Sequence, residues 1–266
     1  MRSALSIAGS DPTGGAGLQA DLQVFSAFGV HGAGVVSALT IQDSSKVHQV
    51  LPVFPSVVLE QIRVLLRDIQ PAAVKLGMLA SDDVVRNVEL GLAVLAPEVP
   101  LVIDPILLAS DGTPLLERRA WGSLISLFER AALVTPNLRE AEELAGRDVS
   151  TRKGCEAAAR VFVEELGCAA VLVKGGHRSG APDDLFASRE HDGTRFAWLA
   201  GERIELGPEG VHGTGCALSA AITAGLALGQ PIDKAVDEGR SFVAGALRAA
   251  EAPGSGARFL VRPARP

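Results

Sequence analysis

The stretch ALSIAGSDPTGGAGLQADLQVFSAF, residues 4–28, decides the fold class of this chain. It begins with the apolar run Ala4–Ala8, passes through a glycine-rich turn and continues into a predicted helix, Gly15–Phe28. The apolar run does not alternate regularly with polar residues, as is typical of a strand covered by helices on both faces. A strand that leads directly into a helix is the β-α unit from which parallel sheets are built.

The same unit recurs through most of the chain. Further strands are predicted at Gly34–Ile41, Ala72–Leu76, Leu101–Asp104, Ala132–Thr135 and Ala170–Lys174. Helices are predicted at Ser56–Ile69, Asp82–Leu95, Leu115–Arg130, Leu138–Leu144, Thr151–Leu166, Gly215–Leu228 and Ile232–Ala250. A short antiparallel excursion is predicted from Phe186–Ala187, Phe196–Leu199 and Arg203–Leu206. The alternation predicts the α/β class with a mostly parallel central sheet.

Length and charge restrict the classes of protein that the chain can belong to. Its 266 residues fit one domain, residues 1–266, with residues 253–266 expected to be an irregular tail rich in Gly, Pro and Arg. With 47% hydrophobic residues the chain can bury an ample core. The formal net charge of −6 argues against a general nucleic-acid binder, which would show a basic face.

The cysteine spacing and the lengths of the apolar runs indicate where in the cell the protein is located. Cys155, Cys168 and Cys216 have no C-x-x-C spacing, so neither a disulfide framework nor a zinc site is indicated. The start of the chain lacks the apolar stretch of a signal peptide, and no run reaches the roughly 20 apolar residues of a membrane span. We therefore expect a cytoplasmic protein with no membrane partner.

Unusual residues follow the ends of the predicted strands. Ligands of parallel sheets bind outside the carboxyl ends of the strands, so residues at these ends are candidates for one common site. The strand-end residues are Gly9-Ser10-Asp11, Gln42, Gly77-Met78, Asp104-Pro105, Pro136-Asn137 and Gly175-Gly176.

The segment VHGTGCALSAA, residues 211–221, predicts an anion site. Two glycines precede a predicted helix, and the N-terminus of a helix offers unpaired N–H groups and partial positive charge. From the residues alone, a plain glycine-rich helix start with a buried cysteine is an equally good interpretation. The chain has no G-x-x-x-x-G-K-[ST] motif, nor a G-x-G-x-x-G that opens its first β-α unit, which argues against P-loop and Rossmann nucleotide sites.

Seven motifs in register resemble the hydroxymethylpyrimidine/phosphomethylpyrimidine kinases of thiamin biosynthesis, in the ribokinase superfamily. The resemblance covers nearly the whole chain apart from its tail, and implies a ribokinase-like three-layer α/β/α sandwich. The motifs are AGSDPTGGAGLQADL (8–22), ALTIQDS (38–44), VKLGML (74–79), VIDPIL (102–107), TPNLREAEEL (135–144), VLVKGGH (171–177) and HGTGCALSAAI (212–222).

The resemblance implies that the glycine turn holds the transferring phosphoryl group. Gly213, Thr214, Gly215 and Cys216 would form the anion hole, where backbone donors stabilise developing negative charge. Cys216 stands where sugar-kinase relatives have an aspartate base. We expect its thiolate to be favoured at the first turn of the helix, and hence Cys216 to accept the proton of the substrate hydroxyl.

The resemblance also implies a site for ATP and Mg²⁺. Asp104 and Glu140 would lie near the metal, and Asn137, Lys174 and His212 near the phosphates. Glu140 would act on the metal through water, since Mg²⁺ keeps several waters. Asn137 and Glu140 also have the spacing of a helix capping box, and both roles can coexist. Lys174 taken alone would more often be a solvent-exposed strand-end residue.

The N-terminal half would hold the acceptor. By resemblance, Gly9, Asp21, Gln42 and Met78 contact the pyrimidine. A carboxylate and an amide can pair with ring nitrogens and an exocyclic amine, and Met78 offers an adaptable apolar face. Without the resemblance, Asp21 and Gln42 are better interpreted as a surface residue and a loop residue.

Two segments depart from the family pattern. The Thr-x-x-Thr run usual before HGTGC is replaced by residues 206–211, LGPEGV, which puts nucleotide affinity in question. Gln42-Asp43-Ser44 replaces Gln-Asn-Thr and would add a carboxylate near the acceptor.

The resemblance implies phosphorylation, by ATP, of 4-amino-5-hydroxymethyl-2-methylpyrimidine and then of its monophosphate, by a homodimer. Two alternatives stay open: a pyridoxal or pyridoxine kinase, and a non-catalytic pyrimidine-binding regulator on the same fold.

Overall fold

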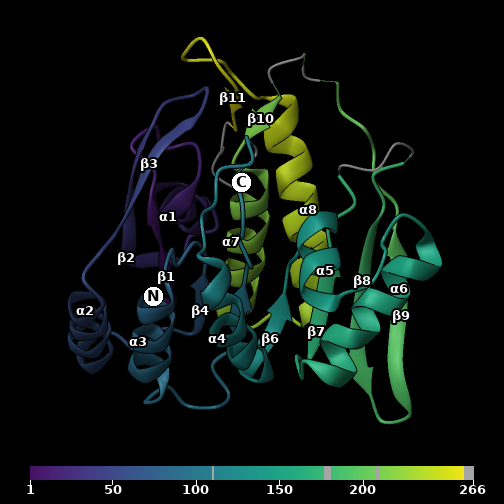
Figure 1. Cartoon of the computed structure of the whole chain (residues 1–266), viewed down its shortest axis with the longest axis horizontal. Helices are drawn as coiled ribbons and strands as arrows, with labels where there is room; N and C mark the ends of the chain where they lie inside the picture. Colours follow the sequence, from purple (N-terminus) through teal and green to yellow (C-terminus); the bar gives the residue numbers. More distant parts are fainter. Residues whose placement is uncertain (110, 177–180, 206, 208–209, 261–266) are drawn as a thin grey trace.

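The computed structural model describes residues 1–109, 111–176, 181–205, 207 and 210–260, and within these ranges the chain forms a central sheet of nine strands (Figure 1). Their order across the sheet is β3-β2-β1-β4-β5-β6-β7-β8-β9. The bounds are β1 Ser3–Ser10, β2 His31–Gln42, β3 Val47–Pro52, β4 Ala73–Leu76, β5 Leu101–Ile103, β6 Ala131–Val134, β7 Ala170–Val173, β8 Asp184–Glu190 and β9 Gly193–Leu199.

The middle of the sheet is parallel and its two edges are antiparallel. Every pair from β2 across to β7 is parallel, whereas β3 on one edge and β8 and β9 on the other run antiparallel. This confirms the predicted parallel sheet and the antiparallel excursion of β8 and β9. The sequence prediction missed β3, because His48, Gln49 and other exposed residues interrupt its apolar pattern.

Helices cover both faces of the sheet, which confirms the three-layer sandwich. A core cluster joins one face to α2, α3, α4, α5 and α6, and a second cluster joins the other face to α1, α7 and α8 (Figure 1). The bounds are α1 Gly17–Ala27, α2 Pro55–Asp68, α3 Asp82–Leu92, α4 Trp121–Ser126, α5 Leu138–Ala145, α6 Arg152–Arg160, α7 Thr214–Ala227 and α8 Ile232–Arg248. None of the helices within the described ranges combines the length and the hydropathy that a bilayer crossing requires.

Two predicted helices are shorter or less regular than expected. In place of a helix from Leu115, a 3₁₀ turn begins at Arg118 and α4 follows it, because Leu115 and Leu116 donate backbone hydrogen bonds to Leu107 in an extended segment. The helix predicted to end at Leu166 is α-helical only to Arg160 and ends in a π-helical turn.

The C-terminal part is more ordered than the prediction of an irregular tail. β10 (Val211–His212) and β11 (Arg258–Phe259) form a separate parallel pair, so the prediction of an irregular tail from residue 253 is wrong for β11. Residues 261–266 lie outside the described residues. Residues 203–205, predicted as part of the antiparallel excursion, form no strand, and residue 206 lies outside the described part of the chain.

Candidate active site

A pocket of about 780 Å³ opens at the carboxyl ends of the parallel strands, against the N-terminus of α7. Strand ends of a parallel sheet and a helix N-terminus are where phosphorylated ligands bind. Residues predicted from distant parts of the sequence meet in its lining: Gly9, Gln42, Met78, Asp104, Asn137, Glu140, Lys174, His212, Gly213, Thr214, Gly215 and Cys216.

Asp21 is not among the residues that line this pocket. It is fully buried on α1, where its carboxylate accepts hydrogen bonds from the Ser6 hydroxyl at 2.6 Å and from Lys75 Nζ at 2.5 Å. The carboxylate is thus turned toward a buried cation and not toward the pocket in which the contact with the acceptor was expected. The interpretation as a surface residue is wrong, since Asp21 has no exposed surface.

Lys75 was missed by the sequence analysis. It lies in β4 with no exposed surface. Burial lowers its pKa, but the charges of Asp21, Cys216 and Asp104 and the hydrogen bond to Asp21 together outweigh burial and raise it. A lysine inside the apolar run of residues 73–76 is itself a signal, since a buried cation needs an anionic partner.

The turn of residues 213–216, called here the phosphoryl turn, leads into α7. Gly213 has a φ of 81°, in the left-handed region that favours glycine, and directs the chain from β10 into the helix. The N–H groups of the first helical turn have no acceptor within the helix, so they and the helix dipole can attract an anion. No acidic residue lies in this first turn.

Cys216 lies in the phosphoryl turn as expected, but its thiolate is not favoured. Burial raises the pKa of the thiol to about 11, and the charges of Asp21 and Asp104 act in the same direction. The charge of Lys75 lowers the pKa but does not offset this rise. The sequence argument considered the helix N-terminus alone and omitted desolvation and the nearby carboxylates.

Lys174 and Asp104 form an ion pair on the wall of the pocket. Lys174 Nζ donates to Asp104 Oδ1 at 2.8 Å, and the hydroxyls of Thr135 and Ser219 donate to the same carboxylate at 3.1 and 3.2 Å. Burial opposes ionisation of Asp104, but Lys174 and Lys75 outweigh it and lower its pKa. A Cβ added at Gly215 would lie 3.2 Å from Lys174 Nζ, so the ammonium lies against the phosphoryl turn.

Asn137 and Glu140 form the capping box of α5, which confirms the cap interpretation. The Asn137 side chain accepts from the Glu140 N–H at 2.9 Å, and Glu140 accepts from the Asn137 N–H at 2.8 Å. Burial raises the pKa of Glu140 to about 7, and the neighbouring Asp104 adds to the shift while Lys174 opposes it. Both residues also line the pocket, so the cap leaves them available to a ligand.

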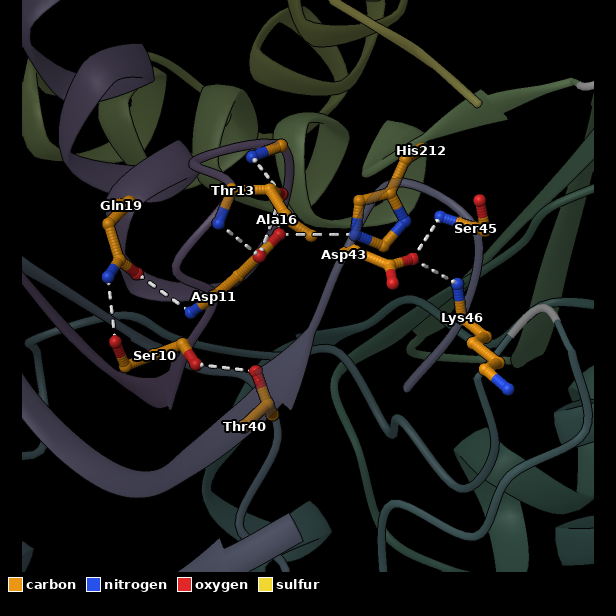
Figure 2. A network of polar contacts seen from close by, with 11 residues as sticks. Ser10, Asp11, Thr13, Ala16, Gln19, Thr40, Asp43, Ser45, Lys46 and His212 are labelled. Carbon is orange, nitrogen blue, oxygen red and sulfur yellow. Dashed lines mark hydrogen bonds and ion pairs between the residues drawn. The ribbon is translucent and has the colours of Figure 1, made fainter. Parts of the chain in front are cut away.

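The acceptor end of the pocket contains Gly9, Gln42 and Met78 together with Thr40, whose hydroxyl donates to the Ser10 carbonyl at 2.9 Å. A Cβ at Gly9 would lie 3.0 Å from Met78 Sδ, so the glycine leaves room for the thioether. The Asp43 carboxylate does not join this lining, contrary to expectation. It accepts from the N–H groups of Ser45 and Lys46 in the turn before β3 (Figure 2).

His212 meets Asp11 across the pocket, from a segment about two hundred residues away in sequence. His212 Nε2 lies 3.1 Å from Asp11 Oδ2, as Figure 2 shows. Burial alone would raise the pKa of Asp11, but hydrogen bonds from His212, Thr13 and Ala16 outweigh it and lower the pKa to about 2. Asp11 is therefore a fixed anion, and the expected phosphate contact of His212 would share the ring with this carboxylate.

The comparisons with known proteins identify the family of this chain. Residues 11–260 match the sequence model of the phosphomethylpyrimidine kinase family. The chain belongs to this family. It is 41% identical, over 93% of this chain and 91% of the relative, to the hydroxymethylpyrimidine/phosphomethylpyrimidine kinase of Rhizobium meliloti (strain 1021).

Solved structures of similar kinases share the fold. The phosphomethylpyrimidine kinase of Clostridium difficile 630 has 34% identity and a TM-score of 0.81, over 93% of this chain and 100% of that one. The pyridoxal kinase of Staphylococcus aureus in complex with AMP-PCP and pyridoxal has 27% identity and a TM-score of 0.88, over 99% and 94%. The kinase family and the ribokinase-like fold expected from the motifs are thus confirmed.

Proposed function

We propose that this kinase transfers the γ-phosphoryl group of ATP to the hydroxyl of 4-amino-5-hydroxymethyl-2-methylpyrimidine, and then a second phosphoryl group to the monophosphate, in thiamin biosynthesis. The observation that carries the proposal is the pocket that joins the phosphoryl turn and the Lys174–Asp104 pair to the acceptor-end residues Gln42 and Met78. ATP would lie over the C-terminal half and the pyrimidine over the N-terminal half.

The nucleotide phosphates would be held by backbone N–H groups of the phosphoryl turn and by Lys174. Phosphoryl transfer depends chiefly on positioning and on electrostatic stabilisation, which these donors supply at the helix start. Lys174 can turn from Asp104 toward a phosphate oxygen without leaving the pocket, since both line it. Asn137 would contact the phosphates from the start of α5.

Glu140 and Asp104 fit a Mg²⁺ ion whose other ligands are phosphate oxygens and water. Among the described residues no cluster of three or more His, Cys, Asp and Glu side chains could form an all-protein cage. Glu140 and Asp104 face the same pocket, and burial with the like charge of Asp104 raises the pKa of Glu140, so a cation there would relieve unfavourable charge. We assign these two residues to the metal, which when bound neutralises charge on the transferring phosphate.

In the transfer, the hydroxymethyl oxygen forms a bond to the γ-phosphorus while the bond from that phosphorus to the bridging oxygen of ADP breaks. The hydroxyl proton must leave, and we assign it to Cys216. Because the pKa of the thiol is about 11, few molecules carry the thiolate near neutral pH. We therefore expect kcat to rise with pH from about 7 to 9.5, nearly tenfold per unit, if this base limits the rate.

The Cys216→Ala variant tests this assignment. It should lower kcat far more than it weakens pyrimidine binding, and its kcat should vary little over the same pH range. Rates should be measured at saturating MgATP with circular dichroism as a control for folding. An unchanged rise with pH in the variant would contradict the assignment of the proton to Cys216.

ADP release with MgATP tests the function itself, with hydroxymethylpyrimidine and pyridoxal in parallel wells and the products resolved by mass. We expect pyrimidine monophosphate followed by pyrophosphate. Turnover of pyridoxal alone would move the function to vitamin B6 salvage, the second candidate, which is favoured by the TM-score of 0.88 to a pyridoxal kinase. Pyrimidine binding without ADP release in either well would support the non-catalytic regulator.

The assembly and location are also proposals. We propose one kinase domain over residues 1–266, a homodimer and a cytoplasmic location. The shared sheet from β1 to β9 supports the single domain. Light scattering after size exclusion tests the homodimer, and a mass of one chain would overturn it.

A further inference from the structure

The segment of residues 251–260, called here the strap, follows α8 and runs beside the segment that leads into the phosphoryl turn. Its strand β11 pairs with β10, the strand that leads into the phosphoryl turn (Figure 1). The Arg258 N–H donates to the Gly210 carbonyl at 3.1 Å, and Glu251 and Phe259 exchange backbone hydrogen bonds of 3.0 and 2.7 Å that fold the strap on itself. Backbone hydrogen bonds therefore hold the strap next to the strand that leads into the phosphoryl turn.

The strap is also attached to the acceptor half of the protein. The Ala257 N–H donates to the Ser44 carbonyl at 2.8 Å, and the Gly256 N–H donates to the Ser44 hydroxyl at 3.1 Å. Ser44 lies in the turn between β2 and β3, two residues after the pocket residue Gln42. The strap thus connects the two halves that hold the acceptor and the phosphoryl group.

Phe259 packs on the imidazole ring of His212. The ring centroids are 6.2 Å apart with a tilt of 47°. The backbone of Gly15 closes against both rings, since a Cβ added there would lie 2.8 Å from His212 Cδ2 and 3.1 Å from Phe259 Cδ1. The imidazole is thus packed between the strap and the loop of residues 9–17, called here the acceptor loop.

His212 joins the acceptor loop to the phosphoryl turn. Its ring contacts Asp11, which itself accepts hydrogen bonds from the N–H groups of Thr13 and Ala16 at 2.8 Å each. Its backbone continues directly into Gly213, where a Cβ would lie only 2.0 Å from the Gly15 carbonyl. Any rotation of the His212 ring away from Asp11 would release one of the contacts that hold the loop against the turn.

We propose that Phe259 is a positioning residue, which holds His212 against Asp11 and thereby fixes the phosphoryl turn relative to the acceptor loop. The inference rests on the proposed kinase function, because a displaced phosphoryl turn would lower the rate of phosphoryl transfer. Displacement of reacting groups by about 1 Å can lower a rate roughly 100-fold. Phe259 touches neither reacting group, so it acts through His212.

The test compares Phe259→Ala with Phe259→Leu and with Phe54→Ala. Phe54 is 79% exposed before α2 and is a matched control for the loss of a phenyl ring. We expect Phe259→Ala to lower kcat about 10- to 100-fold with the pyrimidine KM within about threefold, Phe259→Leu to restore most of the rate, and the control to match the wild type. A lower melting temperature with unchanged kcat would overturn the proposal.

A double-mutant cycle checks the route through His212. In a His212→Gln background, Phe259→Ala should lower kcat by less than about twofold, because the contact that it supports is already lost. Full additivity of the two effects would overturn the proposal, since Phe259 would then act independently of His212.

Hydrogen exchange separates failure of this proposal from failure of the kinase function. Phe259→Ala should increase deuterium uptake in peptides that contain residues 11–17 and 211–216, and Phe54→Ala should not. This readout needs no turnover, so it stands even if the wild type phosphorylates neither acceptor. Unchanged uptake in both peptides would overturn the strap's role, whatever the wild-type activity.

Discussion

Two lysine–aspartate pairs lie beneath the same edge of the sheet, and they differ in their access to the pocket. Lys75 and Asp21 have no exposed side-chain surface and line no part of the pocket. In the second pair Lys174 is 16% exposed and Asp104 2%, and both line the pocket. Only the second cation can reach a ligand without an internal rearrangement.

The difference shows that a perturbed ion pair does not by itself identify a functional group. Burial opposes ionisation of all four groups. The surrounding opposite charges outweigh burial at Lys75, Lys174 and Asp104, but burial prevails at Asp21, whose pKa is raised. Access to the pocket is what separates a pair that stabilises the fold from a pair that can exchange a partner for a phosphate. Each of the following variants tests one part of this comparison.

The largest effect is expected from Lys75→Met. It leaves Asp21 buried without its cation, and removal of one partner of a buried pair costs about 3–5 kcal/mol of unfolding free energy. Urea denaturation measures this cost. The double variant Lys75→Met with Asp21→Leu should recover more than half of it, because no unpaired charge remains. No recovery in the double variant would show that the pair is not the source of the loss.

Lys174→Met should act mainly on catalysis. We expect kcat to fall about 100-fold through loss of a cation from the transferring phosphate, and unfolding free energy to fall by less than in Lys75→Met. Asp104 keeps its hydrogen bonds from Thr135 and Ser219, which limits the structural loss. Steady-state rates and urea denaturation should be measured on one preparation. Equal stability losses with an unchanged kcat would erase the distinction between the pairs.

Glu140→Gln should change the pH dependence of stability. Burial raises the pKa of Glu140 from the usual 4.5 to about 7, so its stabilising contribution is full below pH 4.5 and is lost as pH rises through 7. The variant should therefore gain about 3 kcal/mol relative to the wild type between these two pH values. Urea denaturation in EDTA measures the difference. A constant difference across this range would contradict the raised pKa.

Asp43→Asn should have the smallest effect. The Asp43 carboxylate faces His48 and the turn before β3, and both partners of that pair are largely exposed. An exposed pair contributes little, so the pyrimidine KM should stay within about twofold of the wild type. Acceptor-dependent initial rates measure it. A larger change would place this carboxylate in the acceptor site after all.

The sequence by itself determined the layered architecture and, Asp21 apart, which of the predicted site residues meet in the pocket. Continuous apolar runs followed by helices required a parallel sheet, whose strand ends must meet at one edge. Six such ends, together with the motif register, predicted that Gln42, Asp104, Lys174 and the phosphoryl turn share a site. The structure places them in one pocket.

Only the tertiary structure decided which partners the buried charged groups have and which strands form at the edges of the sheets. Asp21 turns to Lys75, and Cys216 is desolvated next to carboxylates, because these contacts join residues from different strands and helices. β3 and β11 pair through backbone groups, which leave little pattern in the side chains. Desolvation and long-range pairing depend on which residues are close in three dimensions. The spacing of apolar residues, in contrast, is visible in short stretches of the sequence.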